Sequence, residues 1–407
     1  MAKDTDMLEG KRIVVGITGS VAAHKGADLV SKLTQAGALV DVILTESGAR
    51  FITPVALQGL SGRPVYTDIF ATTGDLAISH VEIGHRADAV VIAPAGAGTL
   101  ARLAHGLADN LLCLTVLATE APVLLAPAMD GHMYENAATQ ANLAILRERG
   151  MTFVGPEEGR LASGMRGRGR MTEPEAIVGA LRQLLARGGD FAGRKVVVSA
   201  GGTQEPVDPV RYVGNYSSGK MGYAIAEAAR DRGAKVVLVS APAALTTPYG
   251  VEKAPVKTAE EMRDAVVAAS KGADVLIMAA AVADYRPARR AGQKIKRTKD
   301  GMTLALVPTP DILAEVKGNL VRVGFAAESQ DLVRNASEKM ARKGLDLIVA
   351  NDITAAGSGF GTDTNQVTVI DKSGAAETLP LLSKYEVANR LLDRIVPLLK
   401  KRRSSRT

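Results

Sequence analysis

The sequence predicts an α/β protein with two doubly wound domains, in which helices cover both faces of a parallel sheet. Three observations support this fold class. Short apolar runs rich in Val, Ile and Leu alternate with amphipathic stretches of helical period, which is the pattern of βαβ units. A similar series of runs appears in each half of the chain. The length of 407 residues fits two or three domains of ordinary size.

The amino-acid composition indicates which kinds of ligand the protein binds. Hydrophobic residues make up 46% and charged residues 23% of the chain, as in ordinary globular proteins. The net charge of +7 is modest for this length, and the tail 400–407 supplies much of it. With 6 Phe, 8 Tyr and no Trp, few aromatic rings could stack on single-stranded nucleic acid. We therefore expect small anionic ligands and no nucleic-acid partner.

Cysteine usage and hydropathy predict the compartment. The single cysteine, Cys113, lies in the apolar run 111–117, where we expect it to be buried. No disulfide can form within the chain, which fits a reducing environment. The N-terminus is polar, and no apolar run reaches the length needed to span a bilayer. A cytoplasmic protein with no membrane partner is the expectation.

The first half opens with a βαβ pattern. We expect a strand at 12–16, a helix at 21–35 that stops at Gly37, and a strand at 39–44. The turn between them lacks a complete G-x-G-x-x-G, and no acidic residue ends the second strand. These absences argue against an NAD-dependent oxidoreductase. They favour a mononucleotide phosphate at the helix start, although a tight turn that needs glycine explains this loop equally well.

The rest of the first half continues the alternation. Strands are expected at 87–93, 122–126 and 152–155, with a small-residue loop at 95–99. Helices are expected through His105, after Asn110, at 139–149 and at 175–187. The segment 159–171 is basic and punctuated by glycines, and such a stretch is not expected to pack by itself. It is predicted to be a mobile flap over a ligand, or else an exposed linker. Gly188 to Asp190 marks a domain boundary, which gives domains 1–189 and 190–407.

The second half restarts with a strand at 195–199, a helix at 221–232 and a strand at 235–240. The loop 201–222 between strand and helix is rich in Gly, Pro and Ser. α/β folds bind phosphorylated ligands at such places, because free backbone N–H groups point outward there. Within this loop, Gly214 to Lys220 nearly forms a P-loop, but Met221 stands where Ser or Thr would hold Mg²⁺. The loop therefore argues against an ordinary ATPase.

The remaining elements complete the second domain. The run 271–278 parallels 85–92 of the first half, and a basic segment at 286–301 is expected to be mobile. Strands follow at 321–325 and 345–350, and the run 366–371 has the pattern of an antiparallel edge strand. The helix at 384–400 closes the chain.

Several motifs occur in a fixed order along both halves. They are 16–22, 79–83, 127–133 and 159–171 in the first half and 201–206, 215–222, 279–287, 294–297, 310–312, 324–328 and 339–343 in the second. On these motifs the chain, from about Lys11 to Leu399, is identified as a member of the bifunctional phosphopantothenoylcysteine decarboxylase / phosphopantothenate–cysteine ligase family of coenzyme A biosynthesis. The resemblance implies two Rossmann-like domains, an N-terminal flavoprotein domain and a C-terminal nucleotide-dependent ligase domain.

The resemblance implies an FMN-dependent decarboxylase in residues 1–189. A cysteine carboxylate next to a saturated carbon has no electron sink, and flavin oxidation of the thiol-bearing carbon creates one. His80 is implied as the acid or base near the flavin, Ser163 as a catalytic residue of the flap, and Asp130 and Met133 as substrate-binding residues. A lone His such as His80 would otherwise more often be structural. The implied FMN contacts are Gly19, Ser20, Thr45, Gly98 and Thr99.

Three positions depart from the family pattern. Asp130 stands where Asn is frequent, and an ionised Asp cannot donate a hydrogen bond to a substrate carboxylate. Ser163 stands where the family often has a Cys that donates a proton, and a hydroxyl is far less acidic than a thiol. Gly96 and Gly98 replace residues that are commonly Thr and Asn. Water or another residue would then deliver the proton. Alternatively, the chain is a ligase whose flavin-binding N-terminal domain is regulatory and inactive as a decarboxylase.

The resemblance implies a ligase in residues 190–407. It would activate 4′-phosphopantothenate with CTP, release pyrophosphate and let the cysteine amine attack the acyl-cytidylate. Asn215 would hold the acyl-cytidylate carbonyl, Lys294 would support the transfer, and Asp284 would contact the nucleotide and is the candidate for Mg²⁺. Taken singly, the lysines would be an ordinary solvated face. The implied CTP contacts are Met278, Ala279, Ala280, Asp284, Lys294, Pro310, Asp311, Ile312, Phe325, Lys339 and Lys343. A homo-oligomer with trimeric flavin domains and dimeric ligase domains is also implied.

Overall fold

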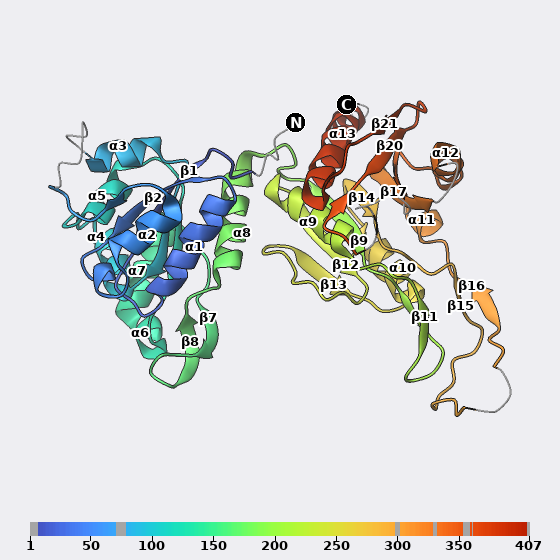
Figure 1. Ribbon diagram of the computed structural model, residues 1–407, viewed down its shortest axis with the longest axis horizontal. Coiled ribbons are helices and arrows are strands. Elements are labelled where there is room, and N and C mark those ends of the chain that lie inside the picture. The colour runs from blue at the N-terminus through green and yellow to red at the C-terminus, as the bar shows by residue number, and fades with distance from the viewer. Residues whose placement is uncertain are drawn as a thin grey trace. The chain divides into compact units, whose positions relative to one another are not determined.

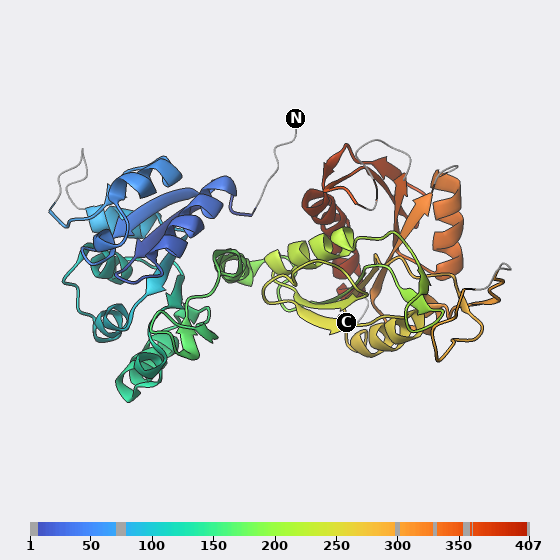
Figure 2. The same ribbon diagram turned by 60° about the horizontal axis from the view of Figure 1, so that its bottom comes forward.

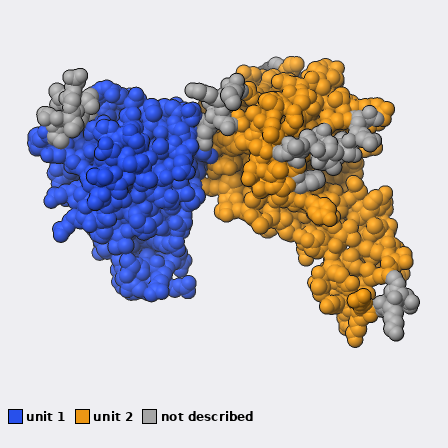
Figure 3. Space-filling model, in the orientation of Figure 1, with its two compact units in different colours: residues 1–185 blue, residues 186–407 orange. Residues whose placement is uncertain are grey.

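The chain folds into two compact units, residues 1–185 and 186–407, which Figure 3 colours separately. This computed structural model describes residues 7–70, 79–297, 302–328, 332–352, 359 and 361–404. Within those ranges, no helix is both long enough and apolar enough to cross a bilayer. Each unit is built around its own sheet (Figure 1).

Unit 1 contains a six-stranded parallel sheet in the order β3-β2-β1-β4-β5-β6. Its strands are β1 Arg12–Ile17, β2 Leu39–Leu44, β3 Val65–Tyr66, β4 Ala89–Ala95, β5 Val123–Pro127 and β6 Thr152–Phe153. Its helices are α1 Ala23–Gln35, α2 Pro54–Ser61, α3 Ser79–Arg86, α4 Ala97–His105, α5 Leu111–Ala118, α6 Gly131–Glu135, α7 Ala137–Glu148 and α8 Pro174–Leu185. Every residue of β4 and β5 is buried, as expected for a sheet with helices on both faces.

Unit 2 contains an eight-stranded sheet in the order β13-β12-β9-β14-β17-β18-β20-β21. Its strands are β9 Lys195–Ala200, β12 Lys235–Ser240, β13 Glu252–Pro255, β14 Val275–Met278, β17 Val321–Glu328, β18 Leu347–Asp352, β20 Val367–Asp371 and β21 Ala376–Thr378. Its helices are α9 Lys220–Asp231, α10 Ala259–Ala269, α11 Ile312–Glu315, α12 Leu332–Lys343 and α13 Lys384–Ser404. The last two strands, β20 and β21, are antiparallel additions.

The two sheets share one topology. In each, the first strand of the unit lies inside the sheet and the strand order reverses beside it, between β1 and β4 and between β9 and β14. This is the strand order of Rossmann-like folds, and the predicted fold class is confirmed. Ligands bind at such a reversal because the loops that follow its strands separate there and leave a crevice.

The first helix of each unit packs against its sheet through a glycine. A Cβ on Gly26 of α1 would lie 2.6 Å from the carbonyl oxygen of Ala93, and one on Gly222 of α9 would lie 2.5 Å from the Cβ of Ala200. Both contacts are closer than real Cβ atoms allow, so a larger residue would push the helix away. These glycines fix the helix starts beside the two crevices.

The segment 159–171 differs from its prediction. It belongs to an antiparallel hairpin of β7 Glu157–Arg160 and β8 Arg166–Arg170 and is not an irregular loop. That it moves as a flap over a ligand stays a prediction. Backbone hydrogen bonds between the two strands hold it, and these need no apolar side chains. At its tip, the amide of Leu161 donates to the Met165 oxygen, and Gly164 has a positive φ of 86°.

Other elements also refine the predictions. Gly98 and Thr99 lie in the first turn of α4 and not in a loop. The strand β20 is not an edge strand, because β21 pairs with its outer side, and the fully exposed β21 carries no apolar pattern that could have predicted it. Cys113 is buried in α5, as predicted.

Three pairs of short strands lie outside the large sheet of unit 2. They are β10 Gln204–Pro206 with β11 Tyr212–Gly214, β15 Tyr285–Pro287 with β16 Leu306–Pro308, and β19 Thr364–Asn365 with β22 Leu382–Ser383. The first pair lies in the loop 201–222. The predicted mobile segment 286–301 lies partly outside the described residues.

Candidate active sites

The crevice of unit 1 forms where β1 and β4 end. The Thr18 hydroxyl donates to the Pro94 carbonyl oxygen over 2.7 Å, which ties together the two loops at the reversal. A Cβ on Gly19 would lie 2.6 Å from the Cβ of Ser47, so only glycine fits there. The Thr45 hydroxyl accepts from the Gly48 amide at 3.1 Å. Gly19 and Thr45 therefore lie close together at one edge of the sheet.

This crevice fits an anionic cofactor group. Helix α1 begins at this loop without a side-chain cap, and the positive end of the helix dipole there favours an anionic group. Ser20 stands at the same turn and accepts from the Ala22 amide at 3.2 Å. Gly98 and Thr99 begin α4 on the other side of the reversal. The predicted FMN contacts thus come from loops and helix starts at the same edge of the sheet.

A cavity of about 340 Å³ opens beside this crevice, between α1 and the hairpin of β7 and β8. It brings together three of the predicted residues, Ser20, Asp130 and Ser163. Met133 is on α6, is 51% exposed and does not line the cavity. Three cationic side chains line the cavity; they are Lys25, Arg160 and Arg170. Its electrostatics suit an anionic substrate.

Both carboxylate oxygens of Asp130 accept hydrogen bonds. One accepts from the Ser163 hydroxyl at 2.7 Å, and the other accepts from the His132 amide at 3.0 Å and caps α6. The Ser163 hydrogen bond first, and the His132 amide second, lower the pKa of the Asp130 carboxyl below its ordinary value. Asp130 is therefore ionised at neutral pH, and it acts as an acceptor in this arrangement.

The hairpin is docked onto the same loop by further contacts. The Met129 amide donates to the Gly169 oxygen at 3.0 Å, and the Lys25 ammonium donates to the Met171 oxygen at 3.1 Å. Lys25 also pairs with Glu173 at 2.9 Å, and that hydrogen bond lowers the pKa of the Glu173 carboxyl. Sequence reasoning missed Lys25; its position in the first turn after the phosphate loop was the available signal.

His80 lies elsewhere in unit 1. It belongs to α3 and does not line the cavity. Figures 1 and 2 both show α3 at the end of unit 1 opposite to the hairpin. A single subunit therefore does not bring His80 together with Ser163.

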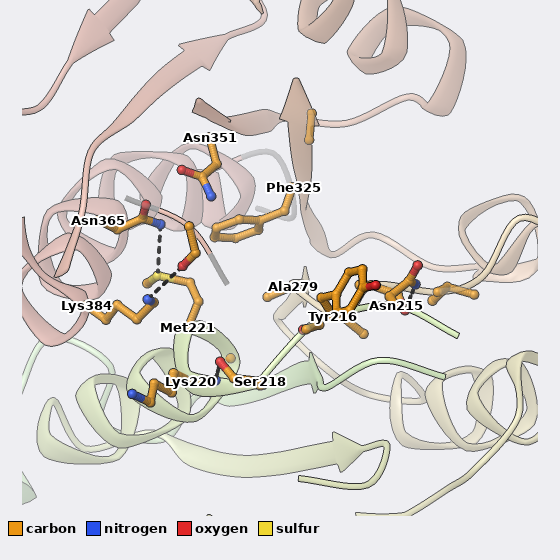
Figure 4. A pocket seen from close by; sticks show the side chains of 18 of the residues that line it. Asn215, Tyr216, Ser218, Lys220, Met221, Ala279, Phe325, Asn351, Asn365 and Lys384 are labelled. Carbon is orange, nitrogen blue, oxygen red and sulfur yellow. Dashed lines mark hydrogen bonds between the residues drawn. The ribbon is translucent and has the colours of Figure 1, made fainter. Parts of the chain in front are cut away.

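Unit 2 has a larger cavity, of about 560 Å³, where β9, β14 and β17 end. It brings together six of the predicted residues, which are Asn215, Ala279, Ala280, Asp284, Phe325 and Lys339. Figure 4 shows Asn215 and Tyr216 at one end, and Phe325, Asn351 and Lys384 at the other. The cavity thus has an end beside the glycine-rich loop and an end lined by amides and an ammonium group.

Asn215 is fixed by the loop that follows β14. Its side-chain amide donates to the Ala281 oxygen at 2.6 Å, and the Thr203 amide donates to the same oxygen at 3.2 Å. The Ala281 amide in turn donates to the Gly201 oxygen at 2.9 Å. These bonds join the first strand's loop to the loop that carries Asp284.

Asp284 is exposed at the cavity wall. Among the described residues, no group of three or more His, Cys, Asp or Glu side chains could hold a metal ion by itself. Mg²⁺ is commonly held by one or two carboxylates together with water and substrate phosphates. The donor set here therefore fits a magnesium ion that arrives with a nucleotide, and not a resident metal.

Comparison with known proteins places the chain in a family. The Flavoprotein family model matches residues 1–186, and the model of the DNA/pantothenate metabolism flavoprotein C-terminal domain matches residues 191–398. The coenzyme A biosynthesis bifunctional protein CoaBC of Bacillus subtilis (strain 168) is 45% identical over 400 residues, which cover 97% of this chain and 98% of that protein. The CoaBC protein of Escherichia coli (strain K12) is 44% identical over 396 residues, with 96% and 97% covered.

The chain belongs to the coenzyme A biosynthesis bifunctional protein family. The prediction of this family from the sequence motifs is confirmed. Two solved structures resemble single units. The C-terminal domain of a CoaBC protein is 39% identical, covers 52% of this chain and 99% of its own, and has a TM-score of 0.45. The FMN-binding protein AtHal3 is 33% identical, covers 43% of this chain and 96% of its own, and has a TM-score of 0.38.

Six of the predicted nucleotide contacts do not line the cavity of this family member; they are Met278, Lys294, Pro310, Asp311, Ile312 and Lys343. Met278 and Ile312 are 8% and 5% exposed and pack in the core, so they can offer only backbone atoms to a ligand.

Lys343 pairs with Asp311. Burial raises the pKa of the Asp311 carboxyl, but Lys343 outweighs burial and lowers it. Lys339 donates to the Phe325 oxygen at 2.9 Å.

Lys294 is exposed, and its neighbour Ile295 is anchored. The Ile295 amide donates to the Asp208 carboxylate at 3.1 Å, and the Arg211 guanidinium donates to the Ile295 oxygen at 2.6 Å. Arg211 and Asp208 also form an ion pair of 2.6 Å. Burial alone would raise the pKa of Asp208, but the Val210 amide and the Arg211 guanidinium hold it well below its ordinary value of 3.8. Sequence reasoning did not single out this pair, which positions the Lys294 segment.

Lys384 is a further site residue that the sequence did not indicate. It is 6% exposed, lines the cavity, and donates to the backbone oxygens of Gly359 at 3.1 Å and Thr364 at 3.3 Å, and also to Thr362. Burial first, and the charge of Lys220 second, lower the pKa of its ammonium group. Lys220, the lysine of the near-P-loop, pairs with Asp363 at 2.7 Å. The two lysines thus hold one wall of the cavity in place.

Proposed function

We propose that the chain converts 4′-phosphopantothenate into 4′-phosphopantetheine in two steps, ligation of cysteine in unit 2 and decarboxylation in unit 1. One observation carries the proposal: in a member of this family, each of two Rossmann-like units has a cavity beside the end of its first strand that contains residues of the family's motifs. The two activities would correspond to residues 190–407 and 1–189.

The proposed ligation uses CTP as co-substrate and Mg²⁺. Asn215 would hold the carbonyl of the acyl-cytidylate, Asp284 would contact the metal and the nucleotide, and Lys339 would line the cavity beside the phosphates. Lys294, exposed on the segment that Asp208 and Arg211 hold in place, would support the transfer. The cysteine amine attacks the activated carbonyl, and cytidine monophosphate leaves. Positive charge from the lysines and the metal would stabilise the negative charge that develops on the leaving phosphate.

The proposed decarboxylation uses FMN, held by the predicted residues Gly19, Ser20, Thr45, Gly98 and Thr99. When bound, the flavin accepts a hydride from the thiol-bearing carbon and later returns it. His80 would be contributed by a neighbouring subunit of a trimer, because α3 and the hairpin are at opposite ends of one unit 1. Dimeric ligase domains and a cytoplasmic location complete the proposal.

Two assays on the purified full-length protein test the proposal. The first supplies 4′-phosphopantothenate and cysteine with either CTP or ATP and measures pyrophosphate; we expect CTP to support the faster release. Equal rates with both nucleotides would contradict the assignment of CTP. The second supplies 4′-phosphopantothenoylcysteine to the flavin-loaded protein and measures CO₂.

A second function has specific support from Asp130 and Ser163, which depart from the family pattern. If flavin-loaded protein releases no CO₂ while pyrophosphate release proceeds, unit 1 is a flavin-binding regulatory domain and the chain is only a ligase. We expect CO₂ release, because the cavity of unit 1 retains the docked hairpin and its cationic lining.

A further inference from the structure

The tip of the hairpin in unit 1 contains Ser163 and lies against the start of α6. The Ser163 hydroxyl donates to one carboxylate oxygen of Asp130 at 2.7 Å, while the other oxygen is occupied by the His132 amide at 3.0 Å. The backbone bond from Met129 to Gly169 fixes this register. Ser163 and Asp130 both line the cavity, so their hydrogen bond faces the space in which a substrate would lie.

Neither Ser163 nor Asp130 alone suits the proton transfer and carboxylate binding that a decarboxylase needs at this place in the cavity. After CO₂ leaves, the carbon that carried it must receive a proton, and a serine hydroxyl is too weak an acid to donate one at neutral pH without an acid behind it. An ionised Asp130 cannot donate a hydrogen bond to the carboxylate of the substrate. Binding of the substrate carboxylate falls instead to the positive charges of Lys25, Arg160 and Arg170, which line the cavity.

We propose that Asp130 and Ser163 act as one proton-transfer pair in the decarboxylation, an inference that rests on the proposed function of unit 1. As the thiol-bearing carbon gives up its hydride, the thiol proton passes to the Ser163 oxygen while the Ser163 proton passes to Asp130. The substrate is then a thiocarbonyl, and Asp130 is a neutral acid. The serine is unchanged, because one O–H bond forms as the other breaks.

The same pair returns the proton. The bond between the carbon and the carboxylate breaks, CO₂ leaves, and its electron pair is delocalised onto the sulfur as an enethiolate. Ser163 donates its proton to the carbon that lost CO₂ and takes the proton of Asp130, which is again a carboxylate. The hydride then returns to the thiol-bearing carbon, and the resulting thiolate takes a proton from water. The sequence consumes one proton overall, as decarboxylation of a carboxylate requires.

A double-mutant cycle on the flavin-loaded protein tests the pair. The variants are Asp130→Asn, Ser163→Ala and the double variant, with 4′-phosphopantothenoylcysteine as substrate and 4′-phosphopantetheine as the measured product. Asn at position 130 retains an acceptor for the His132 amide, so the cap of α6 is kept. We expect each single variant to lower product formation by about 100-fold, and the double variant to fall no further, because both remove the same proton path.

Two further readouts separate a proton path from a structural role. In Ser163→Ala, we expect more CO₂ than 4′-phosphopantetheine. The substrate thiol can still lose its proton to water, so CO₂ still leaves, but the carbon that lost CO₂ has no acid to protonate it. The missing product should accumulate as the enethiol, which mass spectrometry detects. In the Asp130→Asn background, Ser163→Cys should raise product formation by about 10-fold, because a thiol supplies its own acidity.

The control variant is Asp28→Asn on the outer face of α1, and the flavin absorbance of each variant reports loading. If the fold-losses of the two single variants multiply in the double variant, or if Ser163→Ala keeps full activity, Asp130 and Ser163 do not form a proton-transfer pair. Either result would still leave unit 1 a decarboxylase. A flavin-loaded wild type that releases no CO₂ would overturn the proposed function of unit 1 as well.

Discussion

The two units place their predicted residues differently although their strand order is the same. In unit 2, the loops that follow β9 and β14 bring Asn215 and Asp284 into one cavity, and helix α12, which follows β17, adds Lys339. In unit 1, the equivalent edge gathers Ser20, Asp130 and Ser163 and leaves His80 on a distant helix. Parallel strands direct the loops that follow them to one edge, so residues in those loops meet. His80 lies near the start of α3, on the far side of residues 71–78 from β3, and it does not line this cavity.

The units also close their cavities by different means. Unit 1 uses a hairpin that is docked by backbone hydrogen bonds and by the pair of Lys25 and Glu173. Unit 2 uses two lysines, Lys220 and Lys384, which hold the segment that includes Thr362 and Asp363. Variants in one unit should therefore leave the activity of the other unchanged.

The largest effect is expected from His80→Asn. Removal of an acid or base from a reacting centre typically costs about 10²–10⁴-fold in rate, and we expect a loss of this size in CO₂ release. Pyrophosphate release by unit 2 should not change. His105→Asn, an exposed histidine at the end of α4, is the matched control and should retain both activities.

A mixing experiment sharpens the same comparison. If His80 and Ser163 act across a subunit boundary, His80→Asn and Ser163→Ala proteins that are unfolded and refolded together should regain activity. Random trimers would have about a quarter of their sites intact, and the mixture should approach that fraction of the wild-type rate. Absence of any recovery would mean that the two residues do not share a site between subunits.

Asn215→Asp should abolish most ligation. The change removes the donor to the Ala281 oxygen and adds a negative charge where an anionic intermediate must lie. Loss of one donor of this kind costs about 10²–10³-fold, and formation of 4′-phosphopantothenoylcysteine measures it. CO₂ release from supplied 4′-phosphopantothenoylcysteine is the internal control. Retention of full ligation would remove Asn215 from the reaction.

Much of this architecture could be predicted from the sequence, and the reasons for the exceptions are physical. Buried strands such as β1 and β9 are continuous apolar runs, so their positions along the chain and the α/β fold class could be predicted. The exposed strands β7 and β21 have no such run, because backbone hydrogen bonds alone define them. The motif residues Asn215 and Asp130 were found by resemblance. Lys384 and Asp208 were missed because their roles depend on contacts with segments distant in sequence.

Gly169→Ala tests whether the docked hairpin is needed in unit 1. A Cβ at this position would lie 2.2 Å from the Met129 oxygen, so the hairpin must move away from Asp130. We expect CO₂ release to fall by about 10- to 100-fold, since small displacements of reacting groups have effects of this order. Gly167→Ala is the matched control, because its Cβ would meet nothing closer than the Leu161 side chain at 3.8 Å.

Lys384→Met tests the corresponding wall of unit 2. The variant keeps the bulk of the side chain but leaves the oxygens of Gly359 and Thr364 without the ammonium donor. A wall that loses these hydrogen bonds should hold the nucleotide less well, and since each bond to a charged group contributes about 1.5–3 kcal/mol, we expect the KM for the nucleotide to rise by about 10-fold. Lys235→Met, an exposed lysine at the start of β12, should have no effect. An unchanged KM in Lys384→Met would show that this wall does not shape the nucleotide site.

The smallest effect is expected from Asp208→Asn and is best seen in its pH dependence. The pKa of Asp208 is lower in the folded chain than its ordinary value of 3.8, so its stabilising contribution is complete above that value and is lost as the pH falls below it. The melting temperature of unit 2 should drop by a few degrees at neutral pH. That difference from wild type should disappear in acid, and a difference that persists there would assign the loss to packing instead of charge.

If one chain carries both activities, ligation and decarboxylation should yield their products in a fixed ratio. Full-length protein is incubated with 4′-phosphopantothenate, cysteine, CTP and Mg²⁺, and pyrophosphate and CO₂ are measured in the same sample. The account predicts equal amounts of the two products at completion. Pyrophosphate without CO₂ from flavin-loaded protein would contradict the account and leave unit 1 without the catalytic role assigned to it.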